Sequence, residues 1–205
     1  GALMPELMIT DGPVSSDCEG SFSFTRTFSV TVNDHCGNAT SASCDQLIQV
    51  VDDLAPTMAM EASDALVECD GAGNAANLNA WLASNGGAIA SDACSDVTWT
   101  NDFDALSDDC GATGAVTVMF TATDACGNSS STTATFTIED KTDPSVDIEA
   151  MDLTVECDGA GNAADLDAWL ASNGGATASD ACSSVSWSND FDALSDGCGA
   201  SGSAT

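Results

Sequence analysis

Ten cysteines and 33 acidic residues are the groups in this 205-residue chain whose type and spacing could do chemistry. The cysteines recur at fixed positions, because the stretch that begins at Val67 appears again from Val155, 88 residues later. Such spacing is typical of disulfides formed in an oxidising, extracytoplasmic compartment. Zinc is disfavoured, since the chain has no CxxC motif and only one histidine, His35.

The repeat divides the chain into three parts. About 45 of the 63 positions are identical when residues 55–117 are aligned with residues 143–205. The chain therefore reads as a back half (1–54), a complete repeat (55–142) and a front half (143–205), as in a tandem array. Because half a repeat cannot bury a core alone, we expect neighbouring copies in a head-to-tail filament, or adjacent repeats of a longer chain, to complete both halves. We also expect any leader peptide to lie outside this segment.

Alternating apolar residues predict several short strands in each repeat. Gly114–Asp124 places Val118 and Phe120 on one face and threonines on the other, and residues 131–139 repeat the pattern. Shorter strands are expected at Leu66–Cys69 and around Trp99. The turns DACGN and DHCGN follow alternating strands of this kind, the second after GSFSFTRTFSVTV.

One short helix is expected per repeat. In NAANLNAWLASNGG, Asn74 can cap the helix, Leu78 and Trp81 share a face, and a glycine ends it. Short strands around one helix predict an all-β class, with β-sandwich repeats of period 88.

Strand length constrains the disulfide pairing. Cys110 and Cys126 flank a strand of about a dozen residues, which places them roughly 35–40 Å apart and prevents a bond between them. We expect Cys110 at the leading end of a repeat, towards the next one, and Cys126 at the trailing end. The predicted bonds are Cys69–Cys110, Cys94–Cys126 and Cys157–Cys198. Where separate molecules complete the half repeats, Cys182 is expected to bond Cys36 of the next molecule.

The net charge of −31 excludes nucleic acid and argues against anionic membranes as partners, and no segment is apolar enough for membrane insertion. Self-repulsion of this size destabilises a compact chain unless cations neutralise it, and oxygen ligands favour calcium. The alternative is an acidic surface that is simply solvated. Candidate calcium ligands gather at the predicted repeat ends: Asp52, Asp53, Asp92, Asp124, Asn128, Glu68, Asp70, Glu139, Asp140, Asp143, Glu156, Asp158 and Asp180. For any single residue, turn formation is the simpler interpretation.

The segments ASDACSDVTW and FTATDACGNSSSTTATFTIEDKTDP resemble hyalin-type (HYR) immunoglobulin-like repeats, most closely those of large Bacteroidota surface proteins. The resemblance implies an extracellular immunoglobulin-like sandwich that serves in adhesion, stalks or fibres, without catalysis. It also implies a disulfide between the domain start and the last strand. Here Ala134 stands in that strand and only Cys44 keeps half of the bond.

The favoured function is a structural one: an extracellular or cell-surface filament or adhesin stalk, made of disulfide-bonded, calcium-stiffened repeats. The alternative is a calcium-dependent glycan-binding surface module, with Trp81 and Trp99 as a stacking platform. Packing of both tryptophans in a core is the competing interpretation, and near-identical loops favour a spacer. An enzyme is disfavoured, because a repeat array offers neither a cleft nor a carboxyl group of raised pKa.

Overall fold

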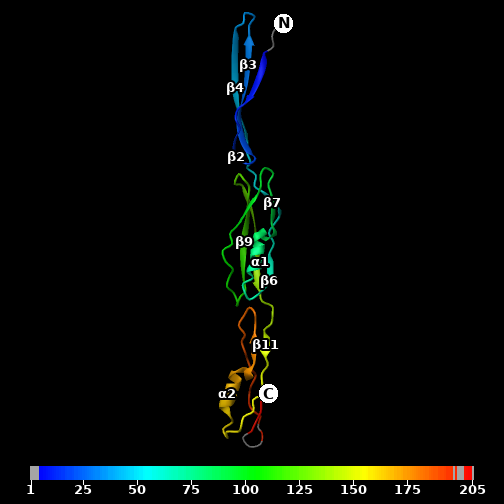
Figure 1. The fold of residues 1–205 in the computed structure, drawn as a ribbon, viewed down its shortest axis with the longest axis vertical. Helices are drawn as coiled ribbons and strands as arrows, with labels where there is room; N and C mark the ends of the chain where they lie inside the picture. Colours follow the sequence, from blue (N-terminus) through cyan, green and yellow to red (C-terminus); the bar gives the residue numbers. More distant parts are fainter. Residues whose placement is uncertain (1–4, 196, 198–200, 205) are drawn as a thin grey trace. The chain divides into compact units, whose positions relative to one another are not determined.

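The computed structural model describes residues 5–195, 197 and 201–204. It is rich in β-strands, with two α-helices in this part of the chain (Figure 1). The fold divides into two compact units, each assembled from separate stretches of sequence. The first comprises Gly1–Ala65, Asn79–Asp104 and Thr117–Thr135, and the second comprises Leu66–Leu78, Ala105–Val116 and Phe136–Thr205. Each unit therefore contains segments from two successive repeats of the sequence.

The N-terminal sheet is built around β3 (Ser21–Asn33), which pairs antiparallel with β1 (Glu6–Asp11), β2 (Ser15–Cys18) and β4 (Ala39–Val50). The turn from β3 to β4 closes where the Asp34 carboxylate accepts backbone N–H groups of Cys36 and Asn38, at 2.9 and 2.7 Å. The predicted strand and DHCGN turn are confirmed.

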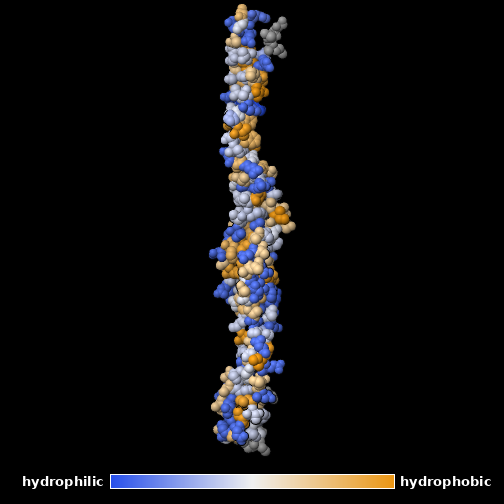
Figure 2. All heavy atoms as spheres, in the orientation of Figure 1, coloured by the Kyte–Doolittle hydropathy of each residue, from blue (hydrophilic) through white to orange (hydrophobic). Residues whose placement is uncertain are grey.

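Apolar side chains of the N-terminal sheet are poorly covered. Phe24, Phe28 and Val30 of β3 are only half-buried, and Leu7 and Ile9 of β1 are exposed. Figure 2 shows hydrophobic residues interspersed with hydrophilic ones on the molecular surface. This sheet therefore keeps an apolar face that its own residues do not bury.

A second sheet has the strand order β6 (Ala65–Glu68), β10 (Ser129–Glu139), β9 (Gly114–Thr123) and β8 (Thr98–Asn101). Val118, Phe120 and Ala122 of β9 are completely buried, whereas Met119 is exposed, so the predicted alternation is confirmed. On β10 the buried residues alternate in the same way at Ala134, Phe136 and Ile138.

The predicted helix is α1 (Ala75–Ala83), followed by the 3₁₀ turn η1 (Asn85–Gly87). Trp81 packs edge-on against Phe120, with ring centroids 5.2 Å apart, and its indole N–H donates to the Ser63 carbonyl. Gly86 has a φ of 65°, and a Cβ there would lie 3.0 Å from a Phe120 ring carbon. Only glycine therefore suits this close approach. Asn74 was expected to cap the helix, but its side-chain amide instead bonds the Asp70 N–H and the Glu68 carbonyl in the preceding loop.

A small two-stranded sheet accompanies each helix, and the sequence analysis did not predict it. β5 (Thr57–Met60) pairs with β7 (Ile89–Ser91), and β11 (Ser145–Ile148) pairs with β12 (Thr177–Ser179). The second pair, α2 (Ala163–Ala171) and η2 (Asn173–Gly175) lie 88 residues after their counterparts. The repeated sequence therefore forms the same helix, 3₁₀ turn and small sheet in the complete repeat and in the front half.

Candidate functional site: two disulfide-linked junctions

Both disulfides in the described part of the chain join residues of successive repeats. Cys18 bonds Cys126 and Cys69 bonds Cys182, with Cα–Cα distances of 5.2 and 6.2 Å. Their sequence separations of 108 and 113 residues exceed the 88-residue offset of the repeat. We call the surroundings of Cys18–Cys126 the first junction and those of Cys69–Cys182 the second junction. Each lies within one of the two compact units.

This pairing corrects the bonds expected from the sequence. Cys69 does not bond Cys110, Cys126 does not bond Cys94, and Cys182 finds its partner inside the chain. The expected bonds within the chain took both partners from one repeat, but the end of a repeat abuts the start of its neighbour, and the cysteine that lies there forms the bond. Cys36, Cys44, Cys94 and Cys110 are exposed thiols. The expected bond from Cys157 involves Cys198, which lies outside the described residues.

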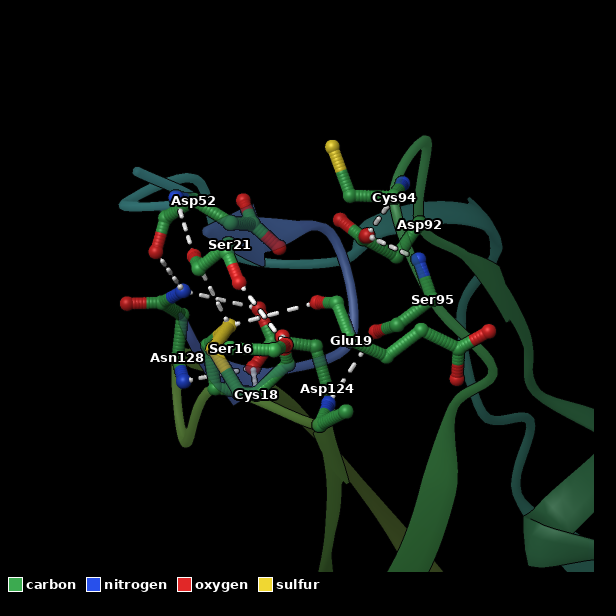
Figure 3. The surroundings of a disulfide bond; sticks show 12 residues. Ser16, Cys18, Glu19, Ser21, Asp52, Asp92, Cys94, Ser95, Asp124 and Asn128 are labelled. Atoms are coloured by element: carbon green, nitrogen blue, oxygen red, sulfur yellow. Dashed lines mark hydrogen bonds between the residues drawn. A yellow bond between two sulfur atoms is a disulfide. The ribbon is translucent and has the colours of Figure 1, made fainter. Parts of the chain in front are cut away.

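The first junction forms where the β2–β3 turn packs against two later turns (Figure 3). Ser21 is buried beside the disulfide, its hydroxyl 3.4 Å from the Cys126 sulfur, and accepts the Asp52 N–H at 2.8 Å. Gly20 has a φ of 86°, and a Cβ there would lie 2.6 Å from the Cβ of Cys94. A side chain at position 20 would therefore separate the two surfaces.

Two carboxylates and a thiol lie together at this junction. Ligand atoms of Asp52, Asp92 and Cys94 lie within 4.8 Å of one another. Asp52 is 8% exposed, and its Oδ2 has no hydrogen-bond partner. Asp52, burial, Asp92 and Asp124 together raise the pKa of the Cys94 thiol. Negative charge is thus concentrated where solvent is partly excluded, which a bound cation would stabilise.

Asp124 and Asn128, also expected as ligands, serve instead to hold the turn. The Asp124 carboxylate accepts the N–H groups of Cys126 and Asn128 at 2.8 Å, and the Asn128 side-chain amide at 2.8 Å. Burial acts to raise the pKa of Asp124, but these hydrogen bonds outweigh it and the pKa lies below its usual value. Asn128 also donates to the Asp52 carbonyl at 3.2 Å, which ties the turn to the linker.

The second junction repeats this arrangement 88 residues later. Asp140, Asp180 and Cys182 stand where the first junction has Asp52, Asp92 and Cys94. Asp180 accepts the N–H groups of Cys182 and Ser183, and these bonds, with a contribution from the Asp140 side chain, lower its pKa. Here the sulfur of the equivalent trio is in a disulfide. The trio is therefore better understood as an acidic pair beside a bonding cysteine than as three metal ligands.

The other predicted ligands either bond groups of loops and linkers or are exposed. Glu68 accepts the Lys141 N–H and the Thr142 hydroxyl, which lowers the pKa of Glu68. Asp70 and Asp158 each accept two backbone N–H groups of the loop that follows, and their pKa values are lowered accordingly. Glu139 forms an ion pair with Lys141. The remaining candidates are exposed: Asp53, Asp143 and Glu156.

The front half contains an open cavity of about 320 Å³ beside the helix α2. It is lined by Trp169, Leu170, Gly174 and Trp187 among others, and Trp187 is 44% exposed. Trp169 and Gly174 lie 88 residues after Trp81 and Gly86, the residues against which Phe120 packs in the complete repeat. The cavity therefore lies where the complete repeat has the side chain of Phe120, from strand β9.

The two basic residues make proteolysis a sensitive probe of the second junction. We expect trypsin to cut after Lys141 slowly, because Glu68 holds the backbone of Lys141 and the side chain of Thr142. Arg26 is protected within β3 and by its ion pair with Asp11. Glu68→Ala should accelerate cleavage after Lys141 without affecting cleavage after Arg26, as followed by intact-mass spectrometry over time. Equal rates in both proteins would show that the Glu68 contacts do not restrain this segment.

Neither the family models nor the curated proteins that were compared with the chain give a match. Within the described residues, no helix has the length and hydrophobicity needed to cross a membrane.

Proposed function

We propose that this protein is a structural component of an extracellular filament or surface stalk, built from tandem immunoglobulin-like repeats. The observation that supports this most directly is that the two disulfides of the described residues join successive repeats rather than closing loops within one. A disulfide within a domain stabilises that domain, whereas a disulfide between two domains restrains their movement relative to each other. Disulfides between repeats allow an array to carry tension along its length without separation of the repeats.

The immunoglobulin-like assignment rests on the paired sheets and on the resemblance to HYR repeats. The complete repeat and the front half each have a small sheet and a helix, and the complete repeat adds the four-stranded sheet with its buried face. Two sheets around a shared apolar core are the arrangement of a β-sandwich. An oxidising, extracellular location would keep the disulfides formed.

Peptide mapping without reduction tests the structural assignment. We expect Cys18 linked to Cys126 and Cys69 linked to Cys182 in the oxidised protein. We also expect electron micrographs of the native material to show fibres that lose their order in reductant. Bonds confined to single repeats, such as Cys69–Cys110, would remove the main support for a cross-linked array.

We further propose that calcium binds at the junctions. Asp52 and Asp92 would hold the ion at the first junction, and Asp140 and Asp180 at the second. Asp52 fits this role because it is buried with a carboxylate oxygen that lacks a partner. Calcium prefers oxygen ligands and would neutralise part of the −31 charge, with water completing its six to eight ligands.

Calcium is expected to raise the melting temperature of the protein, and excess EDTA to reverse the effect. A cation bound only by the folded state adds about 2.7 kcal/mol at 100 times its Kd. Asp52→Asn should reduce the calcium-dependent increase to the part that the second junction supplies, whereas Asp53→Asn, which changes the exposed neighbouring carboxylate, should retain it in full. Calorimetry with and without calcium measures both variants. Equal increases in the two variants would rule out Asp52 as a ligand.

The glycan-binding alternative remains a prediction with less support. It relied on Trp81 and Trp99 as a stacking platform, but Trp81 is buried against Phe120 and Trp99 is half-buried on β8. Core packing accounts for Trp81, as the competing interpretation expected.

A further inference from the structure

The two junctions hold complementary halves of one bonding pattern. Four kinds of cysteine recur in the sequence. They are the cysteine before the long strand (Cys18 and Cys110), the turn cysteine after it (Cys36 and Cys126), the loop cysteine (Cys94 and Cys182), and the cysteine of the VEC segment, which follows β6 in the complete repeat (Cys69 and Cys157). The first junction joins a strand-start cysteine to a turn cysteine. The second joins Cys69 to a loop cysteine.

The two junctions also share the same close contact. At the first, Gly20 of the turn after Cys18 packs on Cys94. At the second, Gly111 of the turn after Cys110 packs on the carbonyl of Cys182, and Ala112 donates its N–H to that carbonyl at 2.8 Å. Cys182 lies 88 residues after Cys94, so one surface is used twice. A bond seen at one junction is therefore geometrically available at the other.

We propose that a complete junction carries both disulfides. Cys110 bonds the turn cysteine of the following repeat, and Cys94 bonds the β6-type cysteine of the preceding repeat. This inference rests on the proposed repeat array. It accounts for two exposed thiols that stand at the junctions, Cys94 beside Gly20 and Cys110 next to Gly111.

The turn that would supply the partner of Cys110 is preformed in this chain. Cys36 and Cys126 lie in turns of the same sequence pattern, each closed by an aspartate that accepts the cysteine N–H and the N–H two residues later. In the following repeat, the strand that precedes this turn would fill the cavity beside Trp169. A second copy could supply the same strand and turn, with Cys36 as the bonding residue.

Bond formation requires an oxidant, for which a small disulfide such as oxidised glutathione suffices. The Cys110 thiolate attacks this disulfide, forms a mixed disulfide and releases one glutathione thiolate. The turn-cysteine thiolate then attacks the Cys110 sulfur and releases the second. Two protein thiols thus become one disulfide, and one glutathione disulfide becomes two thiols, which take up the two protons.

An extended chain tests the proposal directly. Residues 118–142 are repeated after Thr205, which completes the C-terminal repeat and places a new turn cysteine 88 residues after Cys126. The protein is refolded in a glutathione buffer, its thiols are blocked with iodoacetamide, and peptic peptides are mapped without reduction. We expect Cys110 linked to the new cysteine in most molecules. In the matched extension with serine at that position, Cys110 should carry the alkyl group.

The internal bonds serve as the reference. If Cys18–Cys126 and Cys69–Cys182 form while Cys110 is alkylated in the extended chain, this inference fails and the proposed array stands. If those two bonds do not form, both are overturned.

The unextended chain identifies the source of the partner. Disulfide-linked oligomers that map to Cys110–Cys36 and disappear in Cys110→Ser support a second copy. A monomer, combined with the bond in the extended chain, supports a repeat of the same polypeptide.

Discussion

Removing the Cys18–Cys126 disulfide is expected to lower the free energy of unfolding by about 5 kcal/mol. The estimate follows from chain entropy, because a cross-link that closes a loop of roughly 100 residues restricts the unfolded chain by that amount. The bond spans 108 residues, so its loop is longer than a whole repeat. Buried Ser21 and Asp52 lie at the first junction and would lose their packing when its two surfaces separate.

The double variant Cys18→Ser/Cys126→Ser is the material for this measurement, because it leaves neither partner of the bond as a new unpaired thiol. Denaturant unfolding gives the free energy in oxidised protein, with Cys44→Ser as the matched control, since Cys44 is an exposed thiol on β4 away from both disulfides. The control should match the parent protein. A decrease of less than about 1 kcal/mol in the unfolding free energy of the double variant would show that the disulfide of the first junction contributes little to stability.

Trp81→Ala is expected to cost about 3–5 kcal/mol, the usual range for removing a large aromatic side chain from a core. Trp81 is buried, packs against the buried Phe120 and bonds Ser63. Trp169 has the same place in the front half and the same type of hydrogen bond, to Met151. It lines an open cavity instead of facing a phenylalanine, so Trp169→Ala should cost much less.

Thermal or denaturant unfolding of both variants provides the comparison. In the chain extended after Thr205, the repeated residues restore a phenylalanine 88 positions after Phe120, and Trp169→Ala should become nearly as costly as Trp81→Ala. Equal losses of unfolding free energy in the two variants of the unextended chain would mean that both tryptophans are equally well packed. The cavity would then not be an empty site for a phenylalanine side chain.

The sequence predicted the elements whose pattern is local. β9, β10 and α1 follow from alternation or helical spacing, and each forms where it was expected. β5 and β7 escaped prediction because four and three residues are too few for a period to be recognised. The disulfide partners were not predicted from the sequence, for a different reason. Strand length correctly separated Cys110 from Cys126, but the partner of each depends on which surfaces of neighbouring repeats meet.

The roles of the acidic residues were likewise predictable only where they depend on residues nearby in the sequence. Asp34 and Asp124 each bond the backbone two and four residues later, a pattern that the spacing D-x-C-G-N already contains. Turn formation therefore accounts for Asp124, as the simpler interpretation held. The burial of Asp52 was not predictable, because the residue stands in the linker and is covered by a turn more than thirty residues away in the sequence.

Strand β9 has a mechanical consequence when it is considered together with the two cysteines that flank it. It begins four residues after Cys110 and ends three residues before Cys126. If both cysteines carry bonds to neighbouring repeats, the shortest covalent route through a repeat is this strand alone, about 16 residues instead of 88. A strand rises about 3.3 Å per residue, which is close to the limit of a fully stretched chain. Pulled from its ends, such an array has almost no slack to give, and the tension passes first through this strand and the disulfides at its two ends.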